Sequence, residues 1–162
     1  MKRPLVARLL LIGCLLPAPM GGYAHAEETL VWTGRASDGL VSLSYGTLDP
    51  AKTPVFFLSC FDAMGIAVLD LRQDLEGAEQ GEPVTIALSA GTATAEMKGE
   101  VVRDESTGTI LAEASDIAVK PVLEVLRQEG PVAVTTGREN ASLSDSGRPE
   151  AVKLFSDACS LE

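Results

Sequence analysis

The sequence predicts a mainly β protein, an antiparallel β-sandwich or half-open barrel with one or two short helices. Three observations lead to this fold class. Apolar and polar residues alternate along most of the chain after residue 27, and a period of two is typical of strands with one buried face. Clusters of turn residues separate these runs at short intervals, as in all-β sandwiches and barrels. Only two segments show the three- and four-residue spacing of a helix.

The first part of the chain after the leader is expected to form strands. In chain order the strand-like segments are 29–34, 41–45, 54–60, 65–71, 84–88, 93–102 and 109–112. The third segment is apolar up to its end at Cys60, and the fourth is a second apolar run, so we expect both to be buried strands. Residues 62–65 predict the tight turn between them, and residues 74–82 predict an acidic, solvated loop.

Residues 120–130 predict the first helix. Pro121 suits its first turn, and Gly130 suits the position just past its end. The apolar residues between them fall on one face at helical spacing: Val122, Val125 and Leu126. Residues 131–137 and 140–147 then predict a β-hairpin.

Residues 146–159 predict a second helix, with Pro149 in its first position. Three of its residues form one stripe at i, i+3 and i+7: Val152, Phe155 and Cys159. The stripe faces a core, so Cys159 is expected to point inward. Cys60 should also point inward, because it continues the alternation of Phe56 and Leu58.

We therefore predict a disulfide between Cys60 and Cys159 that pins the last helix to a central strand. These are the two cysteines of residues 27–162, and a pair in an exported domain is most often bridged. Closing a loop of about 100 residues adds roughly 4–5 kcal/mol of stability in the chain-entropy treatment. Two alternatives remain: separately buried free thiols, or a redox pair, although the chain has no Cys-x-x-Cys spacing.

The first 26 residues have the three-part layout of a secretory signal peptide. Lys2, Arg3 and Arg8 form a positive head, residues 9–16 form a short apolar run, and Ala24-His25-Ala26 suits a signal peptidase. We expect cleavage after Ala26 and a single exported domain, residues 27–162, in the periplasm or secreted. The alternative is a lipoprotein, because Leu11-Ile12-Gly13-Cys14 resembles a lipobox and would anchor the chain through Cys14. No other apolar run approaches the roughly 20 residues of a transmembrane helix, so no membrane insertion is expected after cleavage.

The charge of the predicted mature chain limits its partners. Its ten basic and 23 acidic residues give a net charge of −13. Nucleic acids and anionic membrane surfaces are bound through clustered Lys and Arg, so neither is an expected partner. A cationic protein is compatible with this charge, and solubility alone also accounts for it.

Several chemistries lack their residues. The one histidine, His25, falls in the predicted signal peptide, which excludes histidine-based catalysis and histidine-ligated metals from residues 27–162. We expect no catalytic residue, no cofactor and no metal site. Two carboxylate pairs, Asp70 with Asp74 and Asp104 with Glu105, remain as possible acid/base or Ca²⁺ groups, but neither has calcium-loop spacing.

Trp32 is the single tryptophan of the chain. An exposed tryptophan often anchors a protein partner, so Trp32 is a possible partner contact. The competing interpretation is that Trp32 packs a first strand onto the core, and the sequence leaves both open.

The C-terminal part of the chain carries a resemblance. Its landmarks are Leu126, Gly130, Val132, Val134, Leu143, Gly147, Phe155 and Cys159, with the Cys60 strand as their upstream counterpart. This pattern resembles the ending of small proteobacterial periplasmic β-proteins, of the invasion-associated locus B type or the type VI secretion accessory type. The resemblance covers about a quarter of the chain. It implies an envelope β-domain with a bridge, and it transfers no catalytic residue.

The leading functional expectation is a non-enzymatic periplasmic or secreted module that binds another envelope or secreted protein. Three alternatives are kept open. One is an inhibitor of a cationic host enzyme such as lysozyme, which would use the acidic charge. The others are an enzyme or ligand carrier that uses carboxylates alone, and a structural envelope protein without a dedicated partner.

Overall fold

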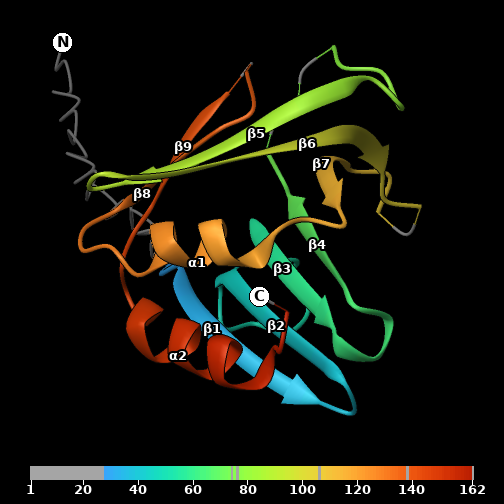
Figure 1. Cartoon of the computed structure of the whole chain (residues 1–162). Coiled ribbons are helices and arrows are strands. Elements are labelled where there is room, and N and C mark those ends of the chain that lie inside the picture. Colours follow the sequence, from blue (N-terminus) through green and yellow to red (C-terminus); the bar gives the residue numbers. More distant parts are fainter. Residues whose placement is uncertain (1–27, 74, 76, 106, 138, 162) are drawn as a thin grey trace, which may run out of the picture.

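The computed structural model describes residues 28–73, 75, 77–105, 107–137 and 139–161. In this part of the chain nine strands form one antiparallel sheet in the order β1-β2-β3-β4-β7-β6-β5-β8-β9 (Figure 1). The strands are β1 (Val31–Ser37), β2 (Leu40–Gly46), β3 (Phe56–Phe61), β4 (Ile66–Leu71), β5 (Pro83–Ala90), β6 (Ala93–Arg103), β7 (Ile110–Ser115), β8 (Val132–Thr135) and β9 (Asn140–Leu143). The mainly β class is confirmed, in the form of one half-open barrel sheet.

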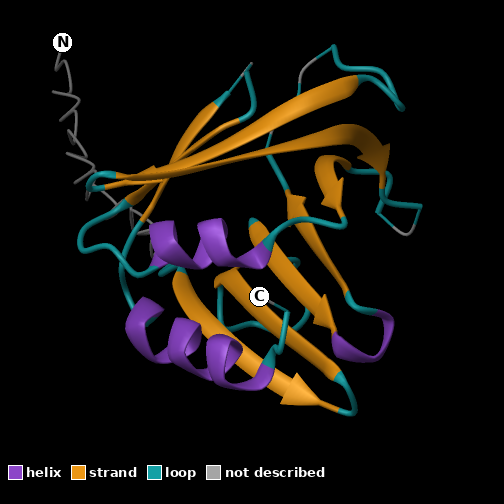
Figure 2. Cartoon of the chain, in the orientation of Figure 1, coloured by secondary structure: helices purple, strands orange, loops and turns teal. Residues whose placement is uncertain are grey.

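Two α-helices and one short 3₁₀-helix accompany the sheet. The α-helices are α1 (Val119–Leu126) and α2 (Arg148–Ala158), and the 3₁₀-helix η1 (Asp62–Met64) joins β3 to β4. Both α-helices lie on the concave side of the curled sheet, with α1 under β5 and β6 and α2 along β1 (Figure 2). Every strand pairing is between antiparallel neighbours. The sheet is built from hairpins plus two longer connections, from β4 to β5 and from β7 through α1 to β8, which leave β4 paired with β7 and β5 paired with β8.

The core lies between the concave face of the sheet and the helices. The largest fully buried side chains come from seven elements: Phe56, Phe155, Leu43, Leu58, Leu69, Leu71, Ile86, Leu88, Leu126, Leu143, Val119 and Val122. On β2 and β4 the buried residues alternate with less buried ones, which is the period-two pattern of a sheet with one packed face. On β3 the same alternation is interrupted by Ser59, which is buried as well. The predicted face of α1 is confirmed, because its apolar residues are those buried.

The two edges of the sheet approach each other through the segment that follows β9. The backbone N–H of Trp32 on β1 donates to the carbonyl of Ser146 at 2.8 Å, and its indole Nε1–H donates to the carbonyl of Ser144 at 2.6 Å. The phenolic oxygen of Tyr45 accepts the backbone N–H of Ser144 at 3.2 Å. Residues about 100 positions apart in the chain therefore hold the open side of the barrel together.

Three details differ from the sequence-based expectation. Helix α1 begins at Val119, so Pro121 lies in its first turn as predicted, but the helix ends earlier than expected, with Arg127 as its C-cap. Gly130 instead turns the following loop, with a φ of 80°. Helix α2 ends at Ala158, and Cys159 is its extended C-cap with a φ of −92°. The predicted stripe of Val152, Phe155 and Cys159 therefore continues one residue beyond the helix.

The predicted signal peptide, including Cys14 and His25, lies outside the described residues. In the part of the chain that is described, no helix is both long and apolar enough to cross a membrane.

Candidate docking surface

Strands β2, β3 and β4 present apolar side chains on their outer face as well as on the core face. The register pairs Leu40 with Phe61 and Phe61 with Ile66, so these three residues form a row across the three strands. Residues directly opposite each other share one face of an antiparallel sheet. Their chain neighbours Val41, Cys60 and Ala67 are the buried ones, so the Leu40–Phe61–Ile66 row faces outward.

Two more apolar residues extend this row. Val68 is two residues beyond Ile66 on the same strand face, and Met64 lies on η1 at the end of the β3–β4 hairpin. We define the outer apolar patch as Leu40, Phe61, Met64, Ile66 and Val68. Leu40 and Met64 are 38% and 62% exposed, and the other three are half-buried. Leu40 begins β2, Phe61 ends β3 and Ile66 begins β4, so these residues adjoin the β1–β2 and β3–β4 turns, which Figure 1 shows at the same end of the sheet.

Charged residues border the outer apolar patch, and most of them are carboxylates. Asp38 lies in the β1–β2 turn two residues before Leu40, and Asp116 follows Ser115, the residue opposite Val68. Asp70 continues the outer face of β4 beyond Val68 and is opposite Glu113 on β7. On the edge strand β1 the exposed Arg35 is opposite Ser42 and so shares this outer face. The patch is therefore apolar at its centre, with three carboxylates and one guanidinium at its rim.

Asp70 has an electrostatic environment that disfavours its ionised form. Partial burial raises its pKa from 3.8 to about 6, and the facing Glu113 carboxylate adds to the rise. Arg72 acts in the opposite direction, while Asp104 contributes a further small rise. The rim of the patch thus contains a carboxyl group that takes up a proton near pH 6.

Of the two carboxylate pairs kept open from the sequence, only Asp104 with Glu105 lies wholly within the described residues. Asp74, the predicted partner of Asp70, lies outside them. Asp104 forms an ion pair with Arg72 at 2.6 Å, and its second oxygen accepts the backbone N–H of Thr107 at 3.3 Å. These contacts hold the β6–β7 turn, which gives Asp104 a structural role.

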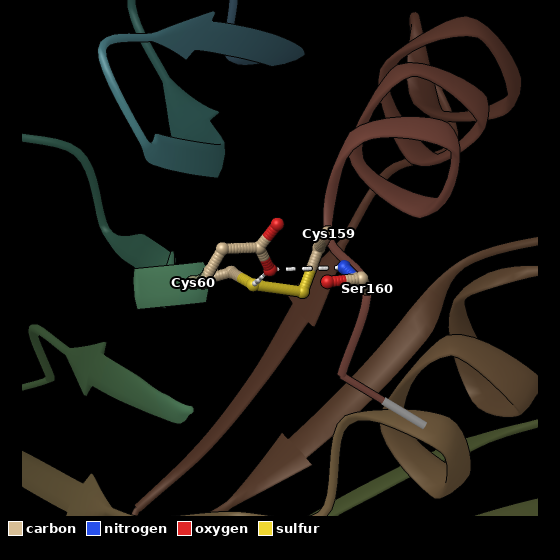
Figure 3. Close-up of a disulfide and its surroundings, with 4 residues drawn as sticks. Cys60, Cys159 and Ser160 are labelled. Carbon is tan, nitrogen blue, oxygen red and sulfur yellow. Dashed lines mark hydrogen bonds between the residues drawn. A yellow bond between two sulfur atoms is a disulfide. The ribbon is translucent and has the colours of Figure 1, made fainter. Parts of the chain in front are cut away.

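The predicted disulfide is present. Cys60 and Cys159 are bonded, with their Cα atoms 6.0 Å apart, so the alternative of free thiols is wrong (Figure 3). The Asp62 carboxylate accepts the backbone N–H of Ser160 at 3.0 Å and lies 3.5 Å from the Cys60 sulfur. Within the described residues, one cluster brings together three potential metal-ligating side chains: Cys60, Asp62 and Cys159. The disulfide uses both sulfurs, so only the Asp62 carboxylate could bind a metal ion there.

Trp32 lies in the core. It is 3% exposed, and its ring packs at 5.1 Å from the rings of both Tyr45 and Phe56. This burial agrees with the interpretation that Trp32 packs the first strand onto the core, and it leaves Trp32 almost no surface for contact with a partner.

The outer apolar patch was missed at the sequence level, although its signal was present. The apolar runs 54–60 and 65–71 suggested strands buried on both faces, whereas the described residues cover only their concave face. An apolar run in a sheet with one covered face leaves apolar side chains outside, and contiguous patches of this kind mark interaction sites.

Comparisons of the chain with family models, with curated proteins and with solved structures return no match.

Proposed function

We propose that the protein is a non-enzymatic binding module of the bacterial envelope, and that it holds a basic partner protein on the outer apolar patch. The observation that supports this proposal is the Leu40–Phe61–Ile66 row, which lies outside the core and has more carboxylates than basic groups around it. Interfaces of this composition gain affinity from the apolar centre and orientation from the charged rim. Export to an oxidising compartment is part of the proposal, and the leader pattern and the disulfide support it.

The expected partner carries apolar side chains within a basic surface. A basic rim on the partner complements the carboxylates of Asp38, Asp70 and Asp116. Pairing of two copies through this patch is opposed by their like charge, because each predicted mature chain carries −13. We therefore assign the patch to a different protein.

The test uses two matched double variants of residues 27–162. Leu40→Ser with Met64→Ser removes the two exposed side chains of the patch. Leu48→Ser with Leu154→Ser removes the other two exposed large apolar residues. Neither belongs to the patch: Leu48 follows the other end of β2, and Leu154 is on α2. We expect a basic envelope protein to be captured by the wild type and by the Leu48/Leu154 variant, and to be lost with the Leu40/Met64 variant.

The captured protein is then purified and titrated against all three chains. A loss of about tenfold or more in affinity for the Leu40/Met64 variant alone, with binding that weakens as salt rises, would support the proposal. Equal affinity of all three chains would overturn it. A wild-type dimer in sedimentation that the Leu40/Met64 variant abolishes would assign the patch to a second copy instead.

Lysozyme is a convenient basic probe for the inhibitor alternative. Saturable binding that depends on Leu40 and Met64, together with loss of lysozyme activity, would narrow the partner class to this enzyme. Unchanged lysozyme activity in excess protein would remove that alternative.

A further inference from the structure

A second surface feature lies on the other side of the sheet, between the two helices. The end of α1, the loop after it and the first half of α2 enclose a cavity of about 580 Å³. Small-molecule sites occupy roughly 300–1,000 Å³, so this volume suits a small ligand. The outer apolar patch lies on the convex face, and the two features share no residue.

Part of the cavity wall is apolar. Pro149, exposed in the first turn of α2, lines it, and Leu126 from α1 and Val152 from α2 lie at its base, where they are almost fully buried. A hydrocarbon group placed against Pro149, above Leu126 and Val152, would leave water without disturbing the core.

The cavity also gathers positive charge in a strongly acidic chain. Arg127, Arg148 and Lys153 line it, which are three of the ten basic residues of the predicted mature chain. Glu129 and Asp145 line it as well, so the formal charge of the lining is +1. Lys153 additionally pairs with Asp157 one helical turn further along.

Arg148 is the distinctive member of this group, because it is a buried charge. Its side chain is 2% exposed, and its Nη2 donates to the carbonyls of Gln128 at 2.5 Å and Gly130 at 2.6 Å. Its Nη1 has no hydrogen-bond partner among the described residues. Burial lowers the pKa of Arg148, and the charge of Asp145 only partly opposes this effect.

A buried guanidinium that hydrogen-bonds carbonyl groups but no carboxylate has its charge only partly compensated, here by the nearby Asp145. The adjoining open volume is this cavity. Helix α2 also begins here without a side-chain cap, and the N-terminal end of a helix adds a favourable field for an anion.

We propose that this cavity binds a small amphipathic carboxylate. The head group lies toward Arg148 and Lys153 at the start of α2, and the apolar body lies against Pro149, above Leu126 and Val152 at the base of the cavity. The inference is independent of the proposed partner surface, since it rests on different residues on the opposite face of the sheet.

The test titrates octanoate into residues 27–162 and follows backbone amide shifts. For a ligand of this size we expect a 1:1 complex with a Kd on the order of 1 mM. Shifts are expected at Gln128, Gly130 and Val152, and acetate and the uncharged octanamide are expected to bind at least about fivefold more weakly, because each lacks one of the two recognition elements.

Three variants separate binding from folding. Arg148→Met should abolish octanoate binding, but it also removes donors to two carbonyls and its fold must be checked. Lys153→Glu changes an exposed residue and should weaken octanoate about threefold or more. Lys98→Glu makes the same charge change at an exposed position of β6 outside the cavity and should leave the affinity unchanged.

Each outcome of these titrations either supports or overturns the proposed site. Saturable octanoate binding at α1 and α2 that Lys153→Glu weakens and Lys98→Glu does not would support the site. Equal binding of octanoate and octanamide, or an unchanged affinity in Lys153→Glu, would overturn the anion assignment. Absence of saturation, or shifts confined to other elements, would overturn the site itself.

Discussion

Asp70 illustrates how a single side chain on the outer face can work against folding. It lies opposite Glu113, and Glu113 in turn lies opposite Glu100 on β6, so three carboxylates form one row across adjacent strands. Like charges directly opposite each other destabilise a sheet. Burial of Asp70 is the main cause of its raised pKa, and the facing Glu113 carboxylate adds to the rise.

The pH dependence of stability should report this residue. Because the folded pKa of about 6 lies above the ordinary 3.8, the folded chain binds more protons than the unfolded chain between these values. Stability contributed by protonated Asp70 is therefore lost as pH rises from about 4 to about 6. Asp70→Asn should remove this loss and raise the unfolding free energy at neutral pH by about 1–2 kcal/mol, allowing for solvent screening of a partly exposed group.

Urea unfolding of both chains across this pH range measures the effect. The two free energies should converge below the lower pKa, where Asp70 is protonated in both states. Glu96→Gln, an exposed carboxylate on β6, is the control. Equal differences at all pH values would contradict the explanation.

At the scale of elements, the contact between α2 and β1 depends on the absence of a side chain. A Cβ on Gly34 would lie 2.8 Å from the backbone oxygen of Ala151 and 3.3 Å from the Cβ of Leu154. Helix α2 therefore packs against bare backbone, and any larger residue must push it away from the strand.

Gly34→Ala should destabilise the protein by about 1–3 kcal/mol, the usual range for an extra methyl group in a tight contact. Ser37→Ala in the same strand is exposed and should stay within about 0.5 kcal/mol of the wild type. Chemical denaturation of the three chains measures both values. A Gly34→Ala chain as stable as Ser37→Ala would show that α2 has room to move.

Local patterns predicted the elements well, because alternation and helical spacing are set by which face of each segment is buried. The face of α1 and the inward direction of Cys60 followed from spacing alone. The cover over each strand could not be predicted in this way. The apolar sequence of residues 65–71 predicted a strand buried on both faces. Only the tertiary arrangement shows that the outer face of this strand is partly exposed.

Buried charge was equally hidden from the sequence. Arg148 sits beside Pro149 at a predicted helix start, a position that normally faces solvent. It is buried because the first turn of α2 packs against the loop that follows α1, where two backbone carbonyls accept hydrogen bonds from its guanidinium. This contact joins residues about 20 positions apart in the chain, so it produces no periodic pattern that could be recognised in the sequence.

At the scale of the whole molecule, the disulfide joins positions that are 99 residues apart. Replacing both Cys60 and Cys159 with Ala should lower the unfolding free energy by about 4–5 kcal/mol in the chain-entropy treatment. This is a large share of the roughly 5–15 kcal/mol of a typical domain. Denaturation with and without reductant measures the loss, and reductant should leave the double variant unchanged. Equal midpoints for oxidised wild type and double variant would contradict the prediction.

The closure of the barrel by Ser144 and Ser146 ties the first strand to the last segment of the chain. β1 and β2 can pair as soon as both have left the ribosome or translocon, yet α2 and Cys159 follow about 100 residues later. Until then the concave faces of β1 and β2 stay open to chaperones and proteases. A chain cut short before Arg148 would leave that surface permanently exposed. Proteins truncated by late nonsense mutations should therefore be degraded as completely as those truncated by early ones.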